Sequence, residues 1–197
     1  MTAHRRALVA GEINVDLILQ NYHEFPVPGR EVLVDDFVMT LGSAAAICAV
    51  GLSKLGTPVS FVGIAGADPW GDYCLDIMRD AGIDLSAVRR DVRVKTGVTV
   101  SITSPSDRAL VSYLGSIAAL TAGDVDDAAL QRAEHLHVSS YFLQRGLRPG
   151  CRELLRRASR LGLTTSLDPG CDPAGEWGPD LKETLREVDV FFPNEVE

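Results

Sequence analysis

The stretch VSFVGIAGADPWGDYCLDIMRDAG, residues 59–82, joins two kinds of regular structure in a short piece of chain. Residues 59–66 form a continuous apolar run, which is typical of a buried strand, and residues 72–82 have a helical period that ends at Gly82. The glycines of the turn between them have the spacing of a phosphate-binding P-loop. However, Asp72 stands where the essential lysine would be, and Asp68 adds a second negative charge, so we reject that interpretation. The stretch predicts a strand-to-helix connection.

Strand-like and helix-like segments alternate along most of the chain. Residues 7–13 are typical of a buried strand, and residues 43–56 of a helix that is apolar nearly all round. This alternation predicts an α/β fold with a mostly parallel sheet flanked by helices, in one domain over residues 1–197. Further strands are expected at residues 135–143, 164–169 and 189–194, and further helices at residues 151–162 and 181–188.

Two segments interrupt this alternation. Residues 30–40 and residues 95–115 contain strand-like pieces that follow one another without a helix between them. They predict a small antiparallel sheet that stands away from the main sheet as a lid, with lid segments at about residues 15–40 and 95–115. Because a lid of this kind covers a ligand, a binding site is expected beneath it.

The bulk properties limit the expected partners. The 27 acidic and 19 basic residues give a net charge of -8, and no basic run exceeds two residues, so neither nucleic acid nor an anionic membrane is expected. No apolar segment has the length of a signal sequence or a membrane span, so we expect a cytoplasmic protein. Four widely spaced cysteines are expected to be buried and reduced. They are Cys48, Cys74, Cys151 and Cys171.

The segment GEINVDLIL, residues 11–19, carries polar side chains at alternate positions. On a strand, Glu12, Asn14 and Asp16 would point to one face, while the apolar residues between them would point to the other. A carboxylate beside an amide suits a vicinal diol, because both groups can bond hydroxyls. Alternatively, Asn14 and Asp16 are turn residues that follow a strand. The segment alone leaves both interpretations open.

The helix predicted at residues 43–56 begins with small residues. Gly42 would let a ligand approach the backbone, Ser43 can cap the helix, and the free amides of the first turn suit an electron-rich partner. The alternative is a capped core helix with small residues for close packing, and both can hold at once. Later in the chain, His135 and His137 can share one strand face, but no third ligand accompanies them at a suitable spacing. We therefore expect core or surface histidines there.

Eight pieces of the sequence resemble, in their order, the N-terminal part of the PfkB, or ribokinase-like, family of carbohydrate kinases. The resemblance implies a Rossmann-like three-layer α/β fold with a β lid, of which the C-terminal part is missing. It also implies ATP and Mg²⁺ as cofactors, and transfer of the ATP γ-phosphoryl group to a hydroxyl of a sugar or sugar-like molecule. The pieces are GEINVDL, FPVPGREV, GSAAAICAVGLSKLG, VGIAGADPWGD, AGID, KTGVTVSI, SLDPG and FFPNEVE.

The resemblance implies roles for residues near the N-terminus. Asn14 and Asp16 match the family's NxD motif and would bind the sugar hydroxyls. Gly42 and Ser43 would contact the sugar beneath the lid. The family's helix usually opens with two glycines and carries an asparagine soon after. Here Leu41 stands at the first glycine position and Ala46 at the asparagine position. We expect both changes to touch the sugar pocket and to shift the substrate away from ribose.

The nucleotide side is implied by the last residues. Asn194 and Glu197 match the family's NxxE motif near the triphosphate, where Glu197 would help to hold Mg²⁺. The family's catalytic base is an aspartate in a Gly-Ala-Gly-Asp type motif, and no such motif occurs in this sequence. We therefore assign no catalytic residue and expect the isolated 197-residue chain to be inactive.

Three further hypotheses accompany this interpretation. A non-catalytic sugar-binding or regulatory protein could keep the pocket and lid without the phosphoryl-transfer machinery. A nucleoside could replace the free sugar as substrate. Finally, the lid segment VLVDDFVMT, residues 32–40, could pair with a second copy of the chain and form a homodimer, although a monomeric lid is equally compatible with the sequence.

Overall fold

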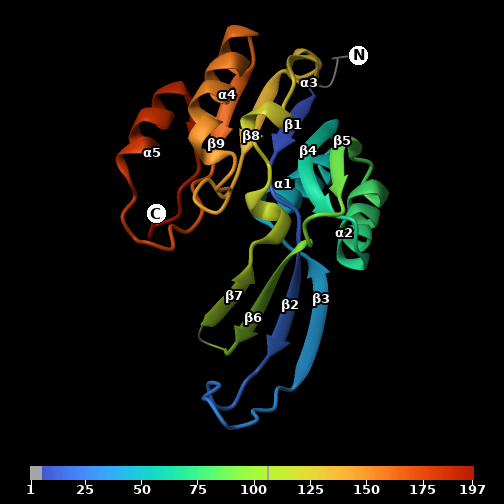
Figure 1. Ribbon diagram of the computed structural model, residues 1–197, viewed down its shortest axis with the longest axis vertical. Helices are drawn as coiled ribbons and strands as arrows, with labels where there is room; N and C mark the ends of the chain where they lie inside the picture. Colours follow the sequence, from blue (N-terminus) through green and yellow to red (C-terminus); the bar gives the residue numbers. More distant parts are fainter. Residues whose placement is uncertain (1–5, 106) are drawn as a thin grey trace.

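The main sheet has six parallel strands (Figure 1). The structure is a computed structural model that describes residues 6–105 and 107–197, so residues 1–5 of the predicted domain and Ser106 of the predicted lid lie outside the described residues. The strand order is β10-β9-β8-β1-β4-β5, and every neighbouring pair is parallel. The mostly parallel sheet predicted from the sequence is confirmed. Its strands are β1 (Ala7–Ala10), β4 (Val59–Gly66), β5 (Asp84–Asp91), β8 (His135–Val138), β9 (Thr164–Leu167) and β10 (Val190–Phe191).

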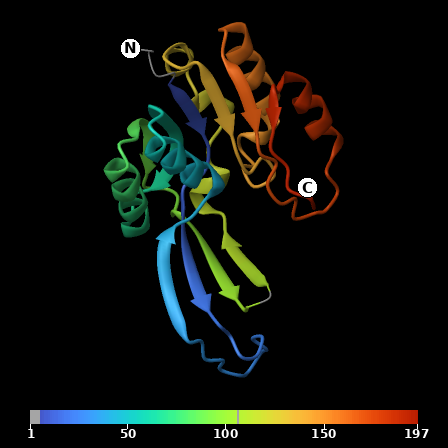
Figure 2. The ribbon, with the colours of Figure 1, turned by 180° about the vertical axis from the view of Figure 1, so that it is seen from behind.

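Helices cover both faces of this sheet and create three layers (Figures 1 and 2). Successive side chains of β1 point to opposite faces of the sheet and pack into two separate hydrophobic cores. Leu8 and Ala10 pack with the buried residues of α4, and Val9 packs with those of α1 and α2. All four residues of β1 are buried, as expected for a central parallel strand. The helices are α1 (Ala44–Lys54), α2 (Pro69–Asp80), α3 (Asp127–Gln131), α4 (Arg148–Arg160) and α5 (Pro179–Thr184), with 3₁₀ turns η1 (Gly115–Ala118), η2 (Ala122–Asp124) and η3 (Leu185–Glu187).

The turn after β4 leads directly into helix α2. Helix α2 begins at Pro69, three residues before the predicted start, and Asp68 caps it by accepting a 2.8 Å hydrogen bond from the amide of Gly71. The same carboxylate accepts hydrogen bonds from the amide of Thr96 at 2.8 Å and from its hydroxyl at 2.7 Å. Asp68 therefore joins the start of α2 to the segment that leads into the lid.

Strand β5 was not predicted from the sequence. It spans eight residues, half of which are charged, and within residues 6–105 and 107–197 it pairs only with β4 at the edge of the sheet. A polar edge strand lacks the apolar run that identifies a buried strand, and charged side chains on such an edge discourage pairing with another chain. The strand is therefore formed by its long-range pairing with β4, which the local pattern does not encode.

The lid is a second sheet with the order β3-β2-β6-β7, formed by β2 (Asn14–Gln20), β3 (Asp36–Leu41), β6 (Gly97–Thr103) and β7 (Arg108–Tyr113). In Figure 1 it projects below the main sheet, away from the helices. Two of its pairings are antiparallel, as predicted, but β2 and β6 are parallel, so the sheet is mixed. Both strands leave the main body and run in the same direction, which the sequence alone did not reveal.

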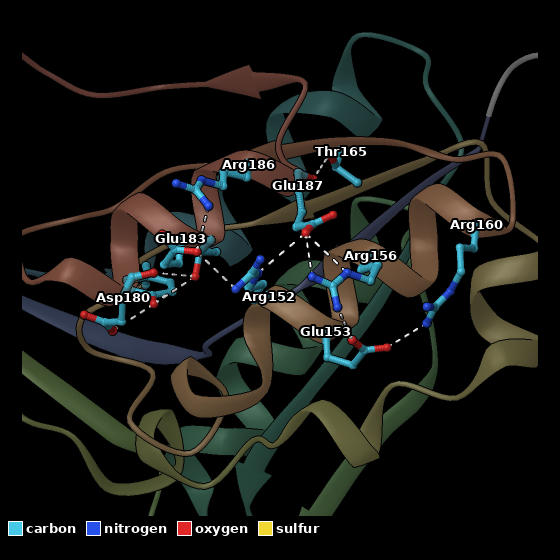
Figure 3. Close-up of polar contacts among 11 residues, drawn as sticks. Arg152, Glu153, Arg156, Arg160, Thr165, Asp180, Glu183, Arg186 and Glu187 are labelled. Carbon is cyan, nitrogen blue, oxygen red and sulfur yellow. Dashed lines mark hydrogen bonds and ion pairs between the residues drawn. The ribbon is translucent and has the colours of Figure 1, made fainter.

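Ion pairs join α4 to the last helices, and a hydrogen bond joins these helices to the sheet (Figure 3). The carboxylate of Glu187 accepts a 2.8 Å hydrogen bond from Nη2 of Arg156, and Arg152 lies 3.2 Å from Glu183. Next to them, the hydroxyl of Thr165 in β9 donates a 2.8 Å hydrogen bond to the backbone oxygen of Glu187. These contacts hold α4, the α5 region and β9 together, and so they position the segment that continues into β10 and the chain's last residues.

The environments of the cysteines differ from one another. Cys74 and Cys151 are buried, as predicted, whereas Cys48 is half-buried and Cys171 is exposed; all four are free thiols. The expectation of buried thiols is thus correct for two of them and wrong for Cys171, because that residue lies in a loop after β9. Within the described part of the chain, no helix combines the length and the apolar character needed to cross a membrane.

Candidate functional site

A cavity of about 440 Å³ lies between the lid and the carboxyl edge of the main sheet. The segments that follow β1, β8, β9 and β10 all reach it, because the carboxyl ends of parallel strands meet at one edge of a sheet. Five of the six predicted site residues line it, and Gly42 lies directly behind two of them. The lining residues are Glu12, Asn14, Asp16, Ile18, Ser43, Ala44, Ile47, Thr99, Ser101, Arg108, Leu110, Ser112, Ile117, Ser140, Leu143, Cys171, Asn194 and Glu197.

Asn14 and Asp16 form a hydrogen-bonded pair on the inner face of the lid. They belong to β2, where Nδ2 of Asn14 donates to Oδ1 of Asp16 at 2.9 Å and to the hydroxyl of Thr99 at 3.3 Å. No described residue donates a hydrogen bond to Oδ2 of Asp16, which leaves that oxygen available to a ligand hydroxyl. Burial raises the pKa of Asp16, against the effects of the Asn14 hydrogen bond and the charge of Arg108. The two residues are therefore strand residues, and the turn interpretation is wrong.

Gly42 makes room for this pair. A Cβ atom at Gly42 would collide with the carboxylate of Asp16 and would lie 2.7 Å from Nδ2 of Asn14. The amide of Gly42 also donates a 2.9 Å hydrogen bond to the backbone oxygen of Asn14. Glycine is needed here because the backbone of the segment entering α1 passes directly against the polar pair.

Ser43 and Glu12 fix the start of helix α1. The hydroxyl of Ser43 accepts a 3.4 Å hydrogen bond from the amide of Ala46 and donates to the backbone oxygen of Glu12, so the predicted cap is confirmed. Ser43 has a φ of 75°, a left-handed conformation that costs a non-glycine residue about 1 kcal/mol or more. The buried carboxylate of Glu12 accepts a 3.2 Å hydrogen bond from the amide of Ala45, and its Oε2 has no hydrogen-bond partner among the described residues.

The two positions that depart from the family pattern do not line the cavity. Leu41 and Ala46 are both buried in the apolar core formed with α2, where Leu41 pairs with Val15 across the lid strands. The expectation that both changes touch the sugar pocket is therefore wrong. Matching of positions identified the departures, but it did not show that these side chains point away from the cavity.

The last residues form a compact loop beside the cavity. Oδ1 of Asn194 accepts hydrogen bonds from the amides of Val196 at 2.9 Å and Glu197 at 3.1 Å, and Oε2 of Glu197 accepts one from the amide of Asn194 at 3.1 Å. Near this loop, burial raises the pKa of Asp168, and the charges of Glu197 and Glu12 raise it further. Asp168 therefore lies within electrostatic reach of both Glu197 and Glu12.

The carboxylate of Glu197 fits a hydrated magnesium ion better than an ion held by protein alone. Among the described residues, no group of three or more His, Cys, Asp or Glu side chains is arranged to hold a metal ion. Mg²⁺ usually keeps several waters and binds one or two carboxylates together with substrate phosphates. The carboxylate of Glu197 at the cavity fits that pattern, and its oxygen atoms agree with the preference of a hard cation; Asp168 lines a second, larger cavity.

Several cavity residues were missed in the sequence. Thr99 and Ser112 share the inner face of the lid with Asp16, and their hydroxyls lie 2.9 Å apart. Arg108 lies on the same face, at the far end of β7. The alternation of polar and apolar residues in both strands was visible in the sequence. Which of the alternate sets faces the ligand depends on the register between strands, and so the pattern alone could not assign them.

A larger cavity of about 550 Å³ lies on a face of the main sheet and contains none of the predicted site residues. His137 and Phe192 line it, and the hydroxyl of Ser166 joins the two histidines, at 2.7 Å from Nε2 of His135 and 2.8 Å from Nδ1 of His137. His137 is buried, and burial lowers its pKa to about 4, so it is neutral near pH 7. The prediction of core histidines is confirmed for His137.

The sequence pattern described as pfkB family carbohydrate kinase matches residues 4–197. The chain is 27% identical over 194 residues to an ATP-dependent ribose-1-phosphate kinase of Halopiger xanaduensis, covering 98% of this chain and 62% of the relative. It is 26% identical to a nucleoside kinase of Methanothermobacter thermautotrophicus, covering 98% and 61%. Its fold is similar to that of Arabidopsis thaliana ribokinase complexed with ribose and ATP, with a TM-score of 0.81, 22% identity, and coverage of 98% and 61%.

The match to the family extends over nearly the whole chain, whereas the chain spans about three fifths of the length of those two relatives. The fold, the lid and the gathering of the NxD and NxxE residues at one cavity agree with the family match. The chain belongs to the pfkB family of carbohydrate kinases.

Proposed function

We propose that the protein transfers the γ-phosphoryl group of ATP to a hydroxyl of a sugar or sugar derivative, and that this chain supplies the acceptor site and the lid. One observation carries the proposal: a single cavity brings Asn14, Asp16 and Ser43 together with Asn194 and Glu197. Sugar-binding groups on one side and a metal-handling carboxylate on the other are what a phosphoryl transfer between two substrates requires.

In this proposal the pair on β2 binds and orients the acceptor. Oδ2 of Asp16 accepts a hydrogen bond from a sugar hydroxyl, and the Asn14 amide holds the carboxylate in position. Glu197, which lines the cavity, would help to hold hydrated Mg²⁺ at the phosphates of ATP. Bound Mg²⁺-ATP supplies the phosphoryl group and neutralises its charge. The lid excludes water and so favours transfer to the sugar over hydrolysis.

The residues of this chain do not include a general base of the family type. No Gly-Ala-Gly-Asp motif occurs in the 197 residues, so we propose that they bind the acceptor but do not by themselves catalyse its phosphorylation. Removal of the base and of the anion-stabilising amides would cost most of the rate, since phosphoryl transfer depends on positioning and electrostatic stabilisation. A non-catalytic sugar-binding protein is the alternative, and the Asn194–Glu197 loop argues against it because a pure sugar binder needs no metal-handling carboxylate.

The relatives differ in the acceptors that their names give. They are named as kinases of ribose 1-phosphate, 5-dehydro-2-deoxygluconate, nucleosides and fructose. We therefore propose an acceptor with sugar hydroxyls and leave a nucleoside as the second candidate. Because ATP is the proposed donor, we also propose a cytoplasmic location.

We further propose that the outer face of the lid pairs with a second copy of the chain. Tyr73 of α2 covers part of this face, but Phe37, Val111 and Tyr113 are 53%, 63% and 56% exposed. A contiguous apolar face of this kind is a common site of association, and a two-fold interface would cover it in both copies. The strand registers give this face only apolar residues: Val15, Leu17, Leu19, Phe37, Met39, Leu41, Val98, Val100, Ile102, Ala109, Val111 and Tyr113.

The test is a coupled assay for ADP production by the protein made from its complete reading frame, with Mg²⁺-ATP and a panel of sugars, sugar phosphates, sugar acids and nucleosides. We expect turnover of one acceptor class and its loss in Asp16→Ala. A shortened product that ends at Glu197 should bind the same acceptor without turnover. Failure of every acceptor in the panel would contradict the kinase proposal, and ADP production by the shortened product would contradict the assignment of the base outside these residues.

A further inference from the structure

The inner face of the lid changes character along its length. Close to the main sheet, Asp16 of β2 is level with Thr99 and Ser112, so the face offers a carboxylate and two hydroxyls. The next row contains Ile18, Ser101 and Leu110. The row after that, near the tip, contains Arg108 opposite Thr103. Moving outward from the main sheet, the face therefore passes from hydroxyl-binding groups to a cation.

Arg108 is the only basic side chain among the described residues that line the cavity. Its guanidinium makes no ion pair or side-chain hydrogen bond with any described residue. Several other exposed arginines are paired, such as Arg30 with Glu24 at 2.8 Å and Arg79 with Asp76, and unlike Arg108 none of these lines the cavity. A guanidinium without a protein partner, aimed into a cavity, has five donors available for a ligand.

The spacing between Asp16 and Arg108 suits an elongated ligand. Four residues of β7 separate the row of Asp16 and Ser112 from that of Arg108, which is about 13 Å along a strand. An arginine side chain is long enough to span part of this distance, and the charge of Arg108 is felt by the Asp16 carboxylate. The gap that remains is comparable to the length of a small sugar, so one molecule can contact both groups.

Arg108 and the two residues of the proposed nucleotide side, Asn194 and Glu197, belong to different parts of the cavity lining. Asn194 and Glu197 follow β10 at the edge of the main sheet, whereas Arg108 lies at the end of β7 nearer the lid tip (Figure 1). An acceptor held between Asp16 and Arg108 would thus place hydroxyls toward the main sheet and its other end toward the lid tip. A guanidinium at that far end selects for a negative charge.

We propose that Arg108 binds a phosphate or carboxylate of the acceptor, so that the preferred substrate is an anionic sugar. The inference rests on the proposed function and narrows it to a substrate class. Arg108 forms charge-assisted hydrogen bonds to the anion, and bidentate geometry favours two oxygens of one phosphate or carboxylate. A neutral sugar would leave the guanidinium to water and gain nothing from it. Arg108 is therefore a specificity-determining residue.

The test compares matched acceptors with the protein made from its complete reading frame. D-ribose is compared with its 1- and 5-phosphates, D-fructose with its 1- and 6-phosphates, and D-glucose with D-gluconate. We expect kcat/KM for an anionic member to exceed that for its neutral partner by at least tenfold. Arg108→Ala should lower the anionic value by roughly 10- to 100-fold and the neutral value by less than about twofold. The phosphate and carboxylate arms distinguish the two anions.

A matched control removes the same charge elsewhere on the lid. Arg30 lies in the loop between β2 and β3, is paired with Glu24, and does not line the cavity, so Arg30→Ala should leave the preference unchanged. Arg108→Lys should restore part of it, because an ammonium keeps the charge but not the bidentate geometry. Equal use of neutral and anionic partners, or a loss in Arg108→Ala that is the same for both, would overturn the inference while leaving the kinase proposal in place.

Absence of turnover with every acceptor would count against the proposed function, and equilibrium dialysis then decides the inference separately. The probes are radiolabelled D-ribose and D-ribose 5-phosphate. Binding of the phosphate that is lost in Arg108→Ala but kept in Arg30→Ala supports an anionic ligand at this site. Equal binding to wild type and Arg108→Ala, or no binding of either probe, overturns it.

Discussion

Replacement of Gly42 by alanine should disturb the pair of Asn14 and Asp16, the proposed sugar-binding groups, without changing either side chain. The new methyl group would collide with the Asp16 carboxylate and lie 2.7 Å from Nδ2 of Asn14. Gly42 is not among the glycines with positive φ, so alanine can adopt its backbone conformation. The effect is therefore steric, and it falls on the two groups that we propose hold the acceptor.

The size of the effect follows from the contacts. Asp16 must move away, which breaks or distorts the 2.9 Å hydrogen bond from Asn14. Overpacking at a well-packed site costs about 1 to 3 kcal/mol in the free energy of unfolding. One hydrogen bond to a charged group contributes about 1.5 to 3 kcal/mol, or roughly 10- to 150-fold in affinity. We expect Gly42→Ala to lose about 1 to 3 kcal/mol in the free energy of unfolding and to bind the acceptor roughly 10- to 150-fold more weakly.

Gly51 provides the matched control. It lies inside α1, and a Cβ there would meet nothing within 4 Å. Gly51→Ala should raise the free energy of unfolding by about 0.5 to 1 kcal/mol, because alanine is the better helix former, and should leave acceptor affinity unchanged. Urea unfolding followed by circular dichroism and acceptor titration by calorimetry measure the two quantities. Wild-type affinity in Gly42→Ala, or an equal loss in both variants, would refute the reasoning.

Three other predictions concern stability and assembly. The pKa of His137 is lowered to about 4, mainly by burial and further by the charge of His135, so between pH 6.5 and about 4 the unfolded state binds a proton that the folded state does not. The free energy of unfolding should therefore fall as the pH falls from about 6.5 toward 4, and it should fall less in His137→Asn. Urea titrations at each pH would measure both. Val111→Asp, on the exposed outer face of the lid, should convert a dimer to a monomer in light scattering with a stability change within about 0.5 kcal/mol; a wild-type monomer at high concentration would contradict the lid interface. Glu187→Gln should remove the ion pair with Arg156 and cost less than about 1 kcal/mol, with a smaller difference in high salt; a loss that salt does not reduce would point to packing instead.

The parts of the fold with a local pattern could be predicted from the sequence. The apolar run of β4, the cap at Ser43 and the presence of helix α1 each depend on neighbouring residues, and each was predicted correctly. The expected burial of α1 was wrong, because only Ala45, Ala46 and Ala49 of the helix are buried and Ile47 is exposed. Strand β5 and the parallel pairing of β2 with β6 depend on contacts between distant segments. Local periodicity reflects only residues that are close in the sequence, so it could not predict these two features.

The site shows the same division. Asn14 and Asp16 were identified because their alternation and the family motif agree, and the structure brings them to the same cavity as Glu197. Arg108 has no motif, and only the strand register shows that it shares a face with Asp16. Leu41 is the converse case. It stands at a motif position, where the family has glycine, so it was expected at the sugar pocket, but its side chain is buried in the core. Side-chain direction is a property of the assembled sheet.

The location of the polar pair links acceptor binding to lid position. Asn14 and Asp16 belong to the lid sheet, whereas Ser43 and Glu197 belong to the main body, and the connection from β1 to β2 is only three buried residues long. A ligand that bonds to both sets must hold the lid at a fixed distance from the main sheet. A ligand that reaches only the lid cannot do so, because it makes no contact whose strength depends on closure. Under the proposed function, recognition of the acceptor and exclusion of water would therefore be one event, and Arg108 at the far end of the same sheet would add its selectivity to that event.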